Sequence, residues 1–221
     1  MTNTEIFSHV DHTRLAAVST WEEIDQLCAE AIRYGAASVC IPPFYLEKAA
    51  RLYPSLSLCT VIGFPLGYST TEVKAFEAAD AVKKGAAEID MVINLCAVKN
   101  GDYETVKRDM EAVKAACNGR TLKVIVETCF LTEEEKIRLC RLVTEVGADY
   151  IKTSTGFGTG GATLEDVDLF RKNIGENVKI KAAGGIRTRE EMEAFLSRGC
   201  DRIGTSGAVK ALFGEGETGN K

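Results

Sequence analysis

Residues 147–152 read Gly-Ala-Asp-Tyr-Ile-Lys, and the same pattern recurs as Gly85-Ala-Ala-Glu-Ile-Asp90, Gly199-Cys-Asp-Arg-Ile-Gly204 and, in a looser form, Gly35-Ala-Ala-Ser-Val-Cys40. In each segment a glycine follows an amphipathic stretch and can adopt the left-handed conformation that ends a helix. A short turn and an apolar strand come next. The repeat predicts helices that alternate with buried strands.

Reading outward from these segments, short runs rich in β-branched residues alternate with amphipathic stretches along the whole chain. Helix starts are indicated by Ser or Thr followed three residues later by an acidic residue, at Thr20/Glu23, Ser69/Glu72, Thr132/Glu135, Thr163/Asp166 and Thr188/Glu191. Eight strands are expected, at Val10–His12, Ser38–Ile41, Leu58–Gly63, Glu88–Asn94, Lys123–Thr128, Tyr150–Thr153, Lys179–Ala182 and Arg202–Gly204.

Repeated strand–helix units with apolar strands indicate an α/β fold with a parallel sheet covered by helices. Eight units in 221 residues suit a closed (β/α)8 TIM barrel, and an open doubly wound sheet is the alternative. No linker or change in composition divides the chain, so we expect a single domain over residues 1–221. In either fold the reactive groups should lie at the carboxyl ends of the strands.

The composition argues against several classes of protein. The sequence is 45% hydrophobic and 27% charged with a net charge of −5, and it has neither a basic block for nucleic acid nor an apolar run long enough to cross a membrane. The N-terminus lacks the pattern of a signal peptide. Eight cysteines are scattered without C-x-x-C spacing, as in a reducing compartment. We expect a cytoplasmic protein whose partner is a small molecule.

Two lysines are candidates for catalysis. Lys152 ends an apolar strand just before a loop rich in Gly, Thr and Ser, and Lys181 lies near the end of the next strand. Two ammonium groups held close together disfavour each other's charge, so the pKa of one of them falls. A neutral amine can attack a carbonyl. The alternative for Lys152 is a barrel lysine paired with a carboxylate.

Asp90 is the third candidate, because it occupies an otherwise apolar strand and should point inward near both lysines. It can act as a plain ion-pair partner or exchange protons during Schiff-base chemistry. Glu127, at the end of the following strand, is expected in the same network.

The last two loops carry the signal for a phosphate. Gly184-Gly185 and Gly204-Thr-Ser-Gly207 follow the seventh and eighth expected strands, where barrels of this type commonly bind phosphate. Glycines allow close approach of the backbone, and Ser206 adds a hydroxyl. Thr155 and Gly156 can supply further donors.

Metal chemistry is disfavoured, because His9 and His12 are the only histidines and no cluster with ligand spacing occurs elsewhere. Asp11, beside His12, is expected either to orient substrate hydroxyls or to have a structural role. Cys40 has no neighbouring histidine to activate it, so we interpret it as a wall residue. No metal and no cofactor are expected.

With these residues in place, the whole chain resembles the deoxyribose-phosphate aldolases. The resemblance rests on the following segments: Val10-Asp-His-Thr-Arg-Leu15, Val39-Cys-Ile-Pro-Pro43, Val61-Ile-Gly-Phe-Pro-Leu-Gly67, Glu88-Ile-Asp-Met-Val-Ile-Asn94, Val124-Ile-Val-Glu-Thr128, Tyr150-Ile-Lys-Thr-Ser-Thr-Gly-Phe157, Lys181-Ala-Ala-Gly-Gly-Ile-Arg-Thr188 and Arg202-Ile-Gly-Thr-Ser206. It implies a class I, cofactor-free, reversible cleavage of 2-deoxy-D-ribose 5-phosphate to D-glyceraldehyde 3-phosphate and acetaldehyde. A homodimer and a place in nucleoside catabolism are also implied.

The resemblance further implies a role for each site residue. Lys152 would form the Schiff base, Lys181 would lower its basicity and assist proton transfer, and Asp90 would donate and accept protons. The phosphate would lie against Gly184, Gly185, Gly204 and Ser206. Some members of the family have a second serine where this chain has Gly207 and end in a tyrosine tail, whereas this chain ends Thr218-Gly-Asn-Lys221.

Four alternatives remain, of which a phosphate-binding isomerase is the most distant. Two are other Schiff-base barrels, a transaldolase-like enzyme or a keto-acid aldolase. The third is a barrel that binds a sugar phosphate without catalysis, and such a barrel would have no need for two lysines and an aspartate on nearby strand ends.

Overall fold

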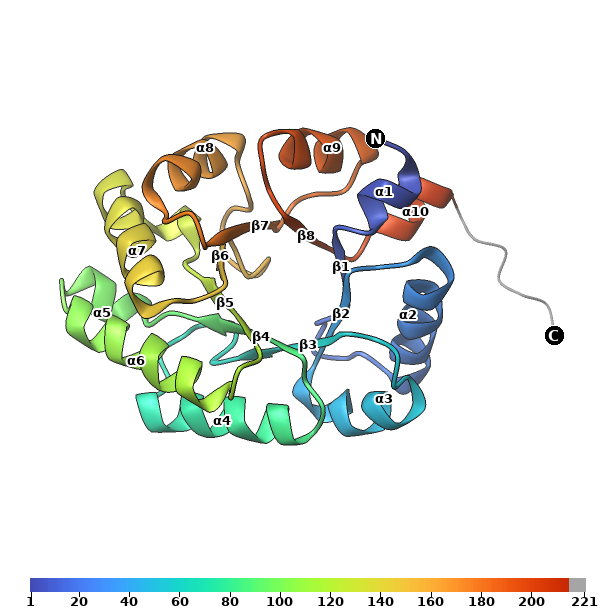
Figure 1. Ribbon diagram of the computed structural model, residues 1–221, viewed down its shortest axis with the longest axis horizontal. Helices are drawn as coiled ribbons and strands as arrows, with labels where there is room; N and C mark the ends of the chain where they lie inside the picture. Colours follow the sequence, from blue (N-terminus) through green and yellow to red (C-terminus); the bar gives the residue numbers. More distant parts are fainter. Residues whose placement is uncertain (215–221) are drawn as a thin grey trace.

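Eight parallel strands form a closed barrel in the order β1 to β8, with each strand bonded to its neighbours in sequence and β8 bonded to β1. The structure is a computed structural model, and it describes residues 1–214. The strands lie at the centre of a ring of helices (Figure 1). They are β1 (Val10–Thr13), β2 (Ser38–Ile41), β3 (Leu58–Ile62), β4 (Glu88–Val92), β5 (Thr121–Ile125), β6 (Tyr150–Lys152), β7 (Lys179–Ala183) and β8 (Arg202–Thr205).

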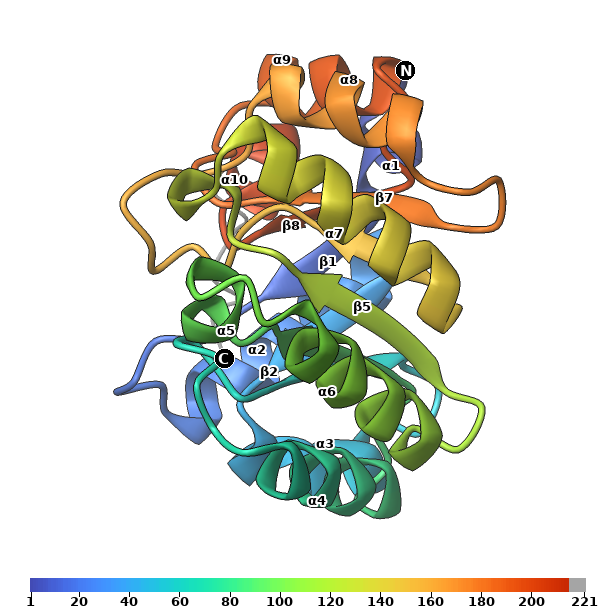
Figure 2. The ribbon, with the colours of Figure 1, turned by 90° about the vertical axis from the view of Figure 1, so that its left-hand side faces the viewer.

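The helices cover the outside of the barrel. Figure 2 shows α6 and α7 alongside β5 on one side of the molecule. None of the helices within residues 1–214 is long and apolar enough to cross a membrane. The α-helices are α1 (Asn3–Phe7), α2 (Trp21–Tyr34), α3 (Leu46–Leu52), α4 (Thr71–Lys83), α5 (Leu95–Lys99), α6 (Tyr103–Ala116), α7 (Glu133–Val146), α8 (Leu164–Asn173), α9 (Arg189–Ser197) and α10 (Ala208–Phe213), and Pro43–Tyr45 and Thr128–Phe130 are short 3-10 helices.

The predicted barrel and its eight strands are confirmed, with shifts of one to a few residues at the ends of most strands. The largest shift concerns the strand expected at residues 123–128, which spans Thr121–Ile125. The early end has a local cause, because Glu127 adopts a left-handed backbone conformation with φ 56° and ψ 67°. This conformation turns the chain out of the extended geometry of a strand.

Four of the five predicted helix starts are confirmed. Thr20, Thr132 and Thr188 form complete capping boxes, and Thr163 accepts a hydrogen bond from the backbone N–H of Asp166. The Ser69/Glu72 prediction is wrong. Here α4 begins at Thr71 with Thr70 as its N-cap and no side-chain cap, so the glutamate falls one position too early in the helix to reach back to the cap.

Alternation along the strands separates two environments. Ile89, Ile151 and Ile203 belong to the apolar core between strands and helices. The next residue in each strand points the other way, toward the barrel axis, and two of these are the charged residues Asp90 and Lys152. The segments that predict the fold therefore also fill the interior of the barrel with charge.

Candidate active site

Asp90 on β4 lies at the centre of the charged interior. One of its oxygens, Oδ2, is 2.7 Å from Nζ of Lys152 on β6 and 2.6 Å from Nζ of Lys181 on β7. The two lysines are register partners on adjacent strands, so the closed sheet fixes their spacing. The structure thus brings together the three residues expected to do the chemistry.

Lys123 completes this arrangement, although the sequence analysis did not single it out. Its Nζ is 2.8 Å from Oδ1 of Asp90, 2.5 Å from Oε2 of Glu88 and 3.5 Å from Oδ2 of Asp11. It is the register partner of Asp90 on β5. The sequence does contain a signal for Lys123, because this lysine interrupts an apolar strand just as Lys181 does.

Asp11 lies deeper than expected. It is fully buried, contacts Lys181 and Arg202, and accepts a hydrogen bond of 2.7 Å from Oγ of Ser38. Arg202 in turn lies 3.1 Å from Glu88. Because its oxygens face these groups inside the barrel and it does not line the cavity described below, we correct the expectation that Asp11 contacts substrate hydroxyls.

These side chains form a buried charge cluster, composed of four cations and three carboxylates (4 − 3 = +1 when all are charged): Lys123, Lys152, Lys181, Arg202, Asp11, Glu88 and Asp90. The cluster exceeds neutrality by one positive charge. Release of one proton by a lysine would leave three cations opposite three carboxylates. Since unpaired buried charge is costly, this balance favours one neutral amine.

The cluster sets the charge of its members. Burial alone would raise the pKa of Asp90, but the ammonium groups of Lys123, Lys152 and Lys181 hold that pKa well below its usual range. Burial alone would lower the pKa of Lys181, but the carboxylates of Asp11 and Asp90 raise it. The pKa of Lys123 is raised by the same carboxylates against the effect of burial. Lys123 and Lys181 therefore stay protonated at neutral pH, and Asp90 stays ionised.

Cys40 and Cys59 lie side by side as register partners on β2 and β3. Cys59 is 3.2 Å from Oδ1 of Asp90, and burial raises its pKa well above the usual range. A hydrogen bond with Cys59 lowers the pKa of Cys40. Both thiols are buried, so Cys40 is packed inside the barrel, and it is not among the residues that line the cavity described below.

A cavity of about 940 Å³ opens at the carboxyl ends of β1, β6, β7 and β8. Of the charge cluster, Lys152 alone lines it, so Lys152 is the amine of the cluster that a ligand in the cavity meets. The expected residues Thr155, Gly184, Gly185, Gly204 and Ser206 also line it, together with four cationic residues that the sequence analysis missed, Arg14, Arg187, Arg189 and Lys210.

Gly184 and Gly185 form a tight turn in the cavity wall, with φ of 86° and 80°. The loop after β6 packs directly against this turn. A Cβ on Gly161 would lie 2.2 Å from the carbonyl oxygen of Gly184, and the N–H of Ala162 donates to that oxygen at 3.1 Å. Residue 161 must therefore be glycine, because its backbone approaches the backbone of Gly184 too closely to leave room for a side chain.

Gly204 has a different reason to be glycine. A Cβ at this position would lie 3.0 Å from Cε of Lys181. The missing side chain therefore leaves room for the lysine to reach Asp90. Nearby, the N–H of Gly207 donates to Oγ1 of Thr205 at 3.1 Å.

Glu127 is not part of the charge cluster, and this expectation is wrong. It accepts hydrogen bonds from the backbone N–H and the hydroxyl of Thr155. Two neutral donors on the β6 loop hold its carboxylate, in place of the lysines. The expectation for the tail residues Thr218–Lys221 lies outside the described residues.

Two groups of side chains have potential metal ligands within 4.8 Å of one another, namely Cys40, Cys59 and Asp90, and Asp11, Cys59 and Glu88. In each group Lys123 already contacts the carboxylates. Its ammonium group thus takes the place that a cation would need.

Comparisons with known proteins agree with this fold and show the family of the chain. Residues 6–212 match the family model described as DeoC/LacD family aldolase. The chain is 57% identical to a deoxyribose-phosphate aldolase of Clostridium botulinum, with 97% of this chain and 98% of the relative covered. It is 51% identical to one of Clostridioides difficile, with 96% and 98% covered.

Solved structures give the same picture. A putative deoxyribose-phosphate aldolase from Coccidioides immitis superposes with a TM-score of 0.92 at 39% identity, covering 96% of this chain and 86% of the other. The deoxyribose phosphate aldolase from Aeropyrum pernix, described as a unique tetramer, gives a TM-score of 0.89 at 34% identity, covering 96% and 91%. The family model and the names of these relatives mark the chain as an aldolase, which is a carbon–carbon lyase. The chain belongs to the DeoC/LacD family of aldolases.

The charge cluster predicts a pH-dependent loss of stability in the Asp11→Asn variant. At pH 7 the free energy of unfolding should fall by about 3 kcal/mol, because Lys181 and Arg202 lose a buried partner. The lysines and the arginine lower the pKa of Asp11 in the folded protein against the effect of burial. Its contribution is therefore complete above its unfolded pKa of about 3.9 and declines below it.

Urea unfolding at pH 7 and pH 3 tests this prediction. At pH 3 the difference between wild type and variant should shrink by about 1 kcal/mol, because the unfolded state then carries a proton that the folded state lacks. An equal difference at both pH values would show that Asp11 does not contribute through its charge.

Proposed function

We propose that the protein catalyses the reversible cleavage of 2-deoxy-D-ribose 5-phosphate to D-glyceraldehyde 3-phosphate and acetaldehyde through a Schiff base on Lys152. The observation that carries the proposal is that Lys152 is the member of a buried lysine–carboxylate cluster that lines the cavity. The names of the Clostridium botulinum and Clostridioides difficile relatives support the choice of substrate.

The charge cluster gives Lys152 the means to act as a nucleophile. When Lys152 loses its proton, the remaining three cations face three carboxylates. The neutral amine attacks the aldehyde carbon of the open-chain sugar phosphate and forms a carbinolamine. Loss of water yields an iminium, whose positive charge again faces Asp90 at the position the ammonium held.

Asp90 and Lys181 are placed to assist the proton transfers. Asp90 contacts both lysines, and Lys181 stays protonated because the carboxylates of Asp11 and Asp90 raise its pKa. The iminium withdraws electrons as the C2–C3 bond breaks, and the C3 hydroxyl loses its proton as glyceraldehyde 3-phosphate leaves. The enamine that remains takes up a proton at its terminal carbon, and water then releases acetaldehyde and Lys152.

We assign the phosphate to the wall of the cavity formed by the last two loops. The turn at Gly184 and Gly185 presents backbone at close range, and Ser206 adds an exposed hydroxyl. The guanidinium of Arg187 lines the same wall and would supply charge for the anion. We reassign Gly204 from phosphate contact to making room for Lys181.

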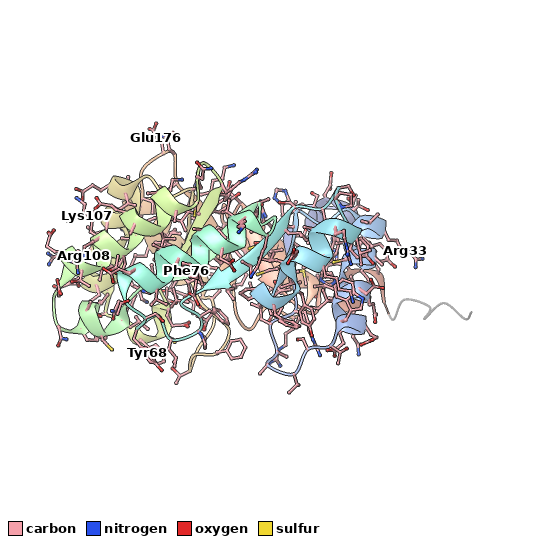
Figure 3. The ribbon with its side chains drawn as sticks, turned by 90° about the horizontal axis from the view of Figure 1, so that it is seen from below. Arg33, Tyr68, Phe76, Lys107, Arg108 and Glu176 are labelled. Atoms are coloured by element: carbon pink, nitrogen blue, oxygen red, sulfur yellow. The ribbon has the colours of Figure 1, made fainter. Side chains whose placement is uncertain are left out.

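We also propose a cytoplasmic enzyme of nucleoside catabolism that acts as a homodimer. All eight cysteines are free thiols, as expected in a reducing compartment. Outer surfaces suited to self-association exist. Figure 3 shows Phe76 on α4 and Tyr68 on the loop before it, and their side chains are 73% and 63% exposed.

Covalent trapping with borohydride tests the role of Lys152. Borohydride reduction in the presence of acetaldehyde should add a two-carbon group to Lys152, because reduction captures the iminium. Peptide mapping by mass spectrometry locates the label. A label confined to another lysine, or no label at all, would contradict the assignment of Lys152 as the Schiff-base lysine.

A second prediction concerns metals. Cleavage activity should be unchanged after dialysis against EDTA, because the iminium provides the electron sink and Lys123 occupies the candidate ligand groups. Activity that is lost on dialysis and restored by a divalent cation would instead indicate a metal-dependent aldolase.

A third prediction distinguishes the two roles considered for Gly204. In Gly204→Ala the new Cβ pushes against Lys181, so both kcat and the rate of acetaldehyde labelling at Lys152 should fall, by about tenfold. If the KM for the phosphorylated sugar rises while labelling is unchanged, Gly204 serves the phosphate and our reassignment is wrong.

A further inference from the structure

Glu127 has an unusual backbone and an unusual environment. It adopts the left-handed conformation with φ 56°, which costs free energy in any residue with a Cβ. Its side chain is 2% exposed, yet no cation within residues 1–214 forms an ion pair with it. A buried carboxylate held only by neutral donors is expensive. Glu127 thus combines a strained backbone with a buried, unpaired carboxylate beside the cavity, and this combination points to a functional role.

The donors all belong to Thr155, three residues after Lys152. The backbone N–H of Thr155 lies 3.1 Å from Oε1 and 3.3 Å from Oε2 of Glu127, and the hydroxyl of Thr155 contacts the same carboxylate. That hydroxyl oxygen also accepts a hydrogen bond of 3.0 Å from the N–H of Phe157. The carboxylate therefore anchors the segment Thr155–Phe157 through one continuous chain of hydrogen bonds.

The next residue packs on the same anchor. A Cβ on Gly158 would lie 2.9 Å from Sγ of Cys129 and 3.1 Å from Cδ of Glu127. The backbone of the loop thus passes directly over the glutamate. Glu127 and this glycine fix where the loop leaves β6.

The anchored segment forms part of the cavity wall. Thr155, Gly156 and Phe157 all line the cavity beside Lys152. The Phe157 ring is 56% exposed and meets Phe64, on the loop after β3, edge to face at 5.3 Å. Gly156 lies next to the turn at Gly184, since a Cβ on Gly184 would be 3.6 Å from the Cα of Gly156, so the position of this segment sets the shape of the cavity between Lys152 and the turn.

We propose that Glu127 is a positioning residue for the aldolase reaction, which holds the wall Thr155–Phe157 so that the phosphorylated part of the substrate is aligned with Lys152. This inference rests on the proposed function. Acetaldehyde has only two carbons and does not extend along the wall, so its reaction with Lys152 does not depend on the anchor. We therefore expect the loss of Glu127 to impair the reaction of deoxyribose 5-phosphate but not the reaction of acetaldehyde with Lys152.

Two variants remove the anchor to different degrees. Glu127→Gly accepts the left-handed backbone and deletes the carboxylate, whereas Glu127→Gln keeps one acceptor oxygen for the N–H of Thr155. A matched control is Asp166→Asn, which alters a buried carboxylate bound to Lys136 at 2.6 Å on the outside of the barrel.

The experiment compares steady-state cleavage of deoxyribose 5-phosphate with borohydride labelling of Lys152 by acetaldehyde. In Glu127→Gly the KM should rise roughly tenfold, the size expected for the loss of a hydrogen bond to a charged group, while the labelling rate stays unchanged. In Glu127→Gln the KM should rise less than in Glu127→Gly. In Asp166→Asn the KM and the labelling rate should both equal the wild-type values.

Each other outcome contradicts the inference in its own way. An unchanged KM in Glu127→Gly would mean that the wall needs no anchor. A parallel fall in labelling would mean that Glu127 supports Lys152 itself. If wild-type protein neither cleaves the sugar phosphate nor becomes labelled at Lys152, the proposed function fails, which is distinct from a failure confined to the Glu127 variants.

Discussion

The structure depends on the burial of Asp90 inside a closed barrel, where its two oxygens accept from three lysines on neighbouring strands. Burying charge is tolerated only when partners are close and well placed, and the parallel register of β4 to β7 supplies them. Lys123 and Lys181 are enclosed and keep their protons, since the neighbouring carboxylates raise the pKa of both. Lys152 is the lysine of the cluster at the border of the cavity. An excess of one positive charge in the cluster thus favours reaction of the one amine that borders the cavity.

The cavity beside Lys152 also determines which substrate can reach this lysine. Cationic side chains such as Arg187 line the cavity together with the glycine turn and Phe157, and Phe157 meets Phe64 edge to face. A ligand with an anionic end and a small aldehyde end matches a cavity lined both by these cations and by Lys152. The rigid backbone contact between Gly161 and Gly184 joins the loops after β6 and β7, so the two loops are built on the same strands that carry the reactive lysines.

Much of this could be predicted from the sequence, because a period of two along each strand and glycine after each helix are local signals. They placed eight strands and brought Asp90, Lys152 and Lys181 together. What failed depended on barrel closure in one case and on an unusual backbone conformation in the other. For Asp11 the sequence left open a contact with substrate hydroxyls or a structural role, and the closure of β8 against β1, which brings Arg202 to it, favours the structural role. Glu127 was expected among the lysines, yet its left-handed backbone turns the side chain to Thr155. Neither contact is visible in sequence spacing.

The central claim is that Lys152, within an intact charge cluster, forms the covalent bond to the substrate. A crystal structure of protein treated with deoxyribose 5-phosphate and borohydride tests it most directly. We expect continuous electron density from Nζ of Lys152 to the sugar carbon, with Asp90 still in contact and with Lys123 and Lys181 unmodified. Covalent density on Lys181 or Lys123, or an intact sugar bound without a covalent bond, would contradict the account.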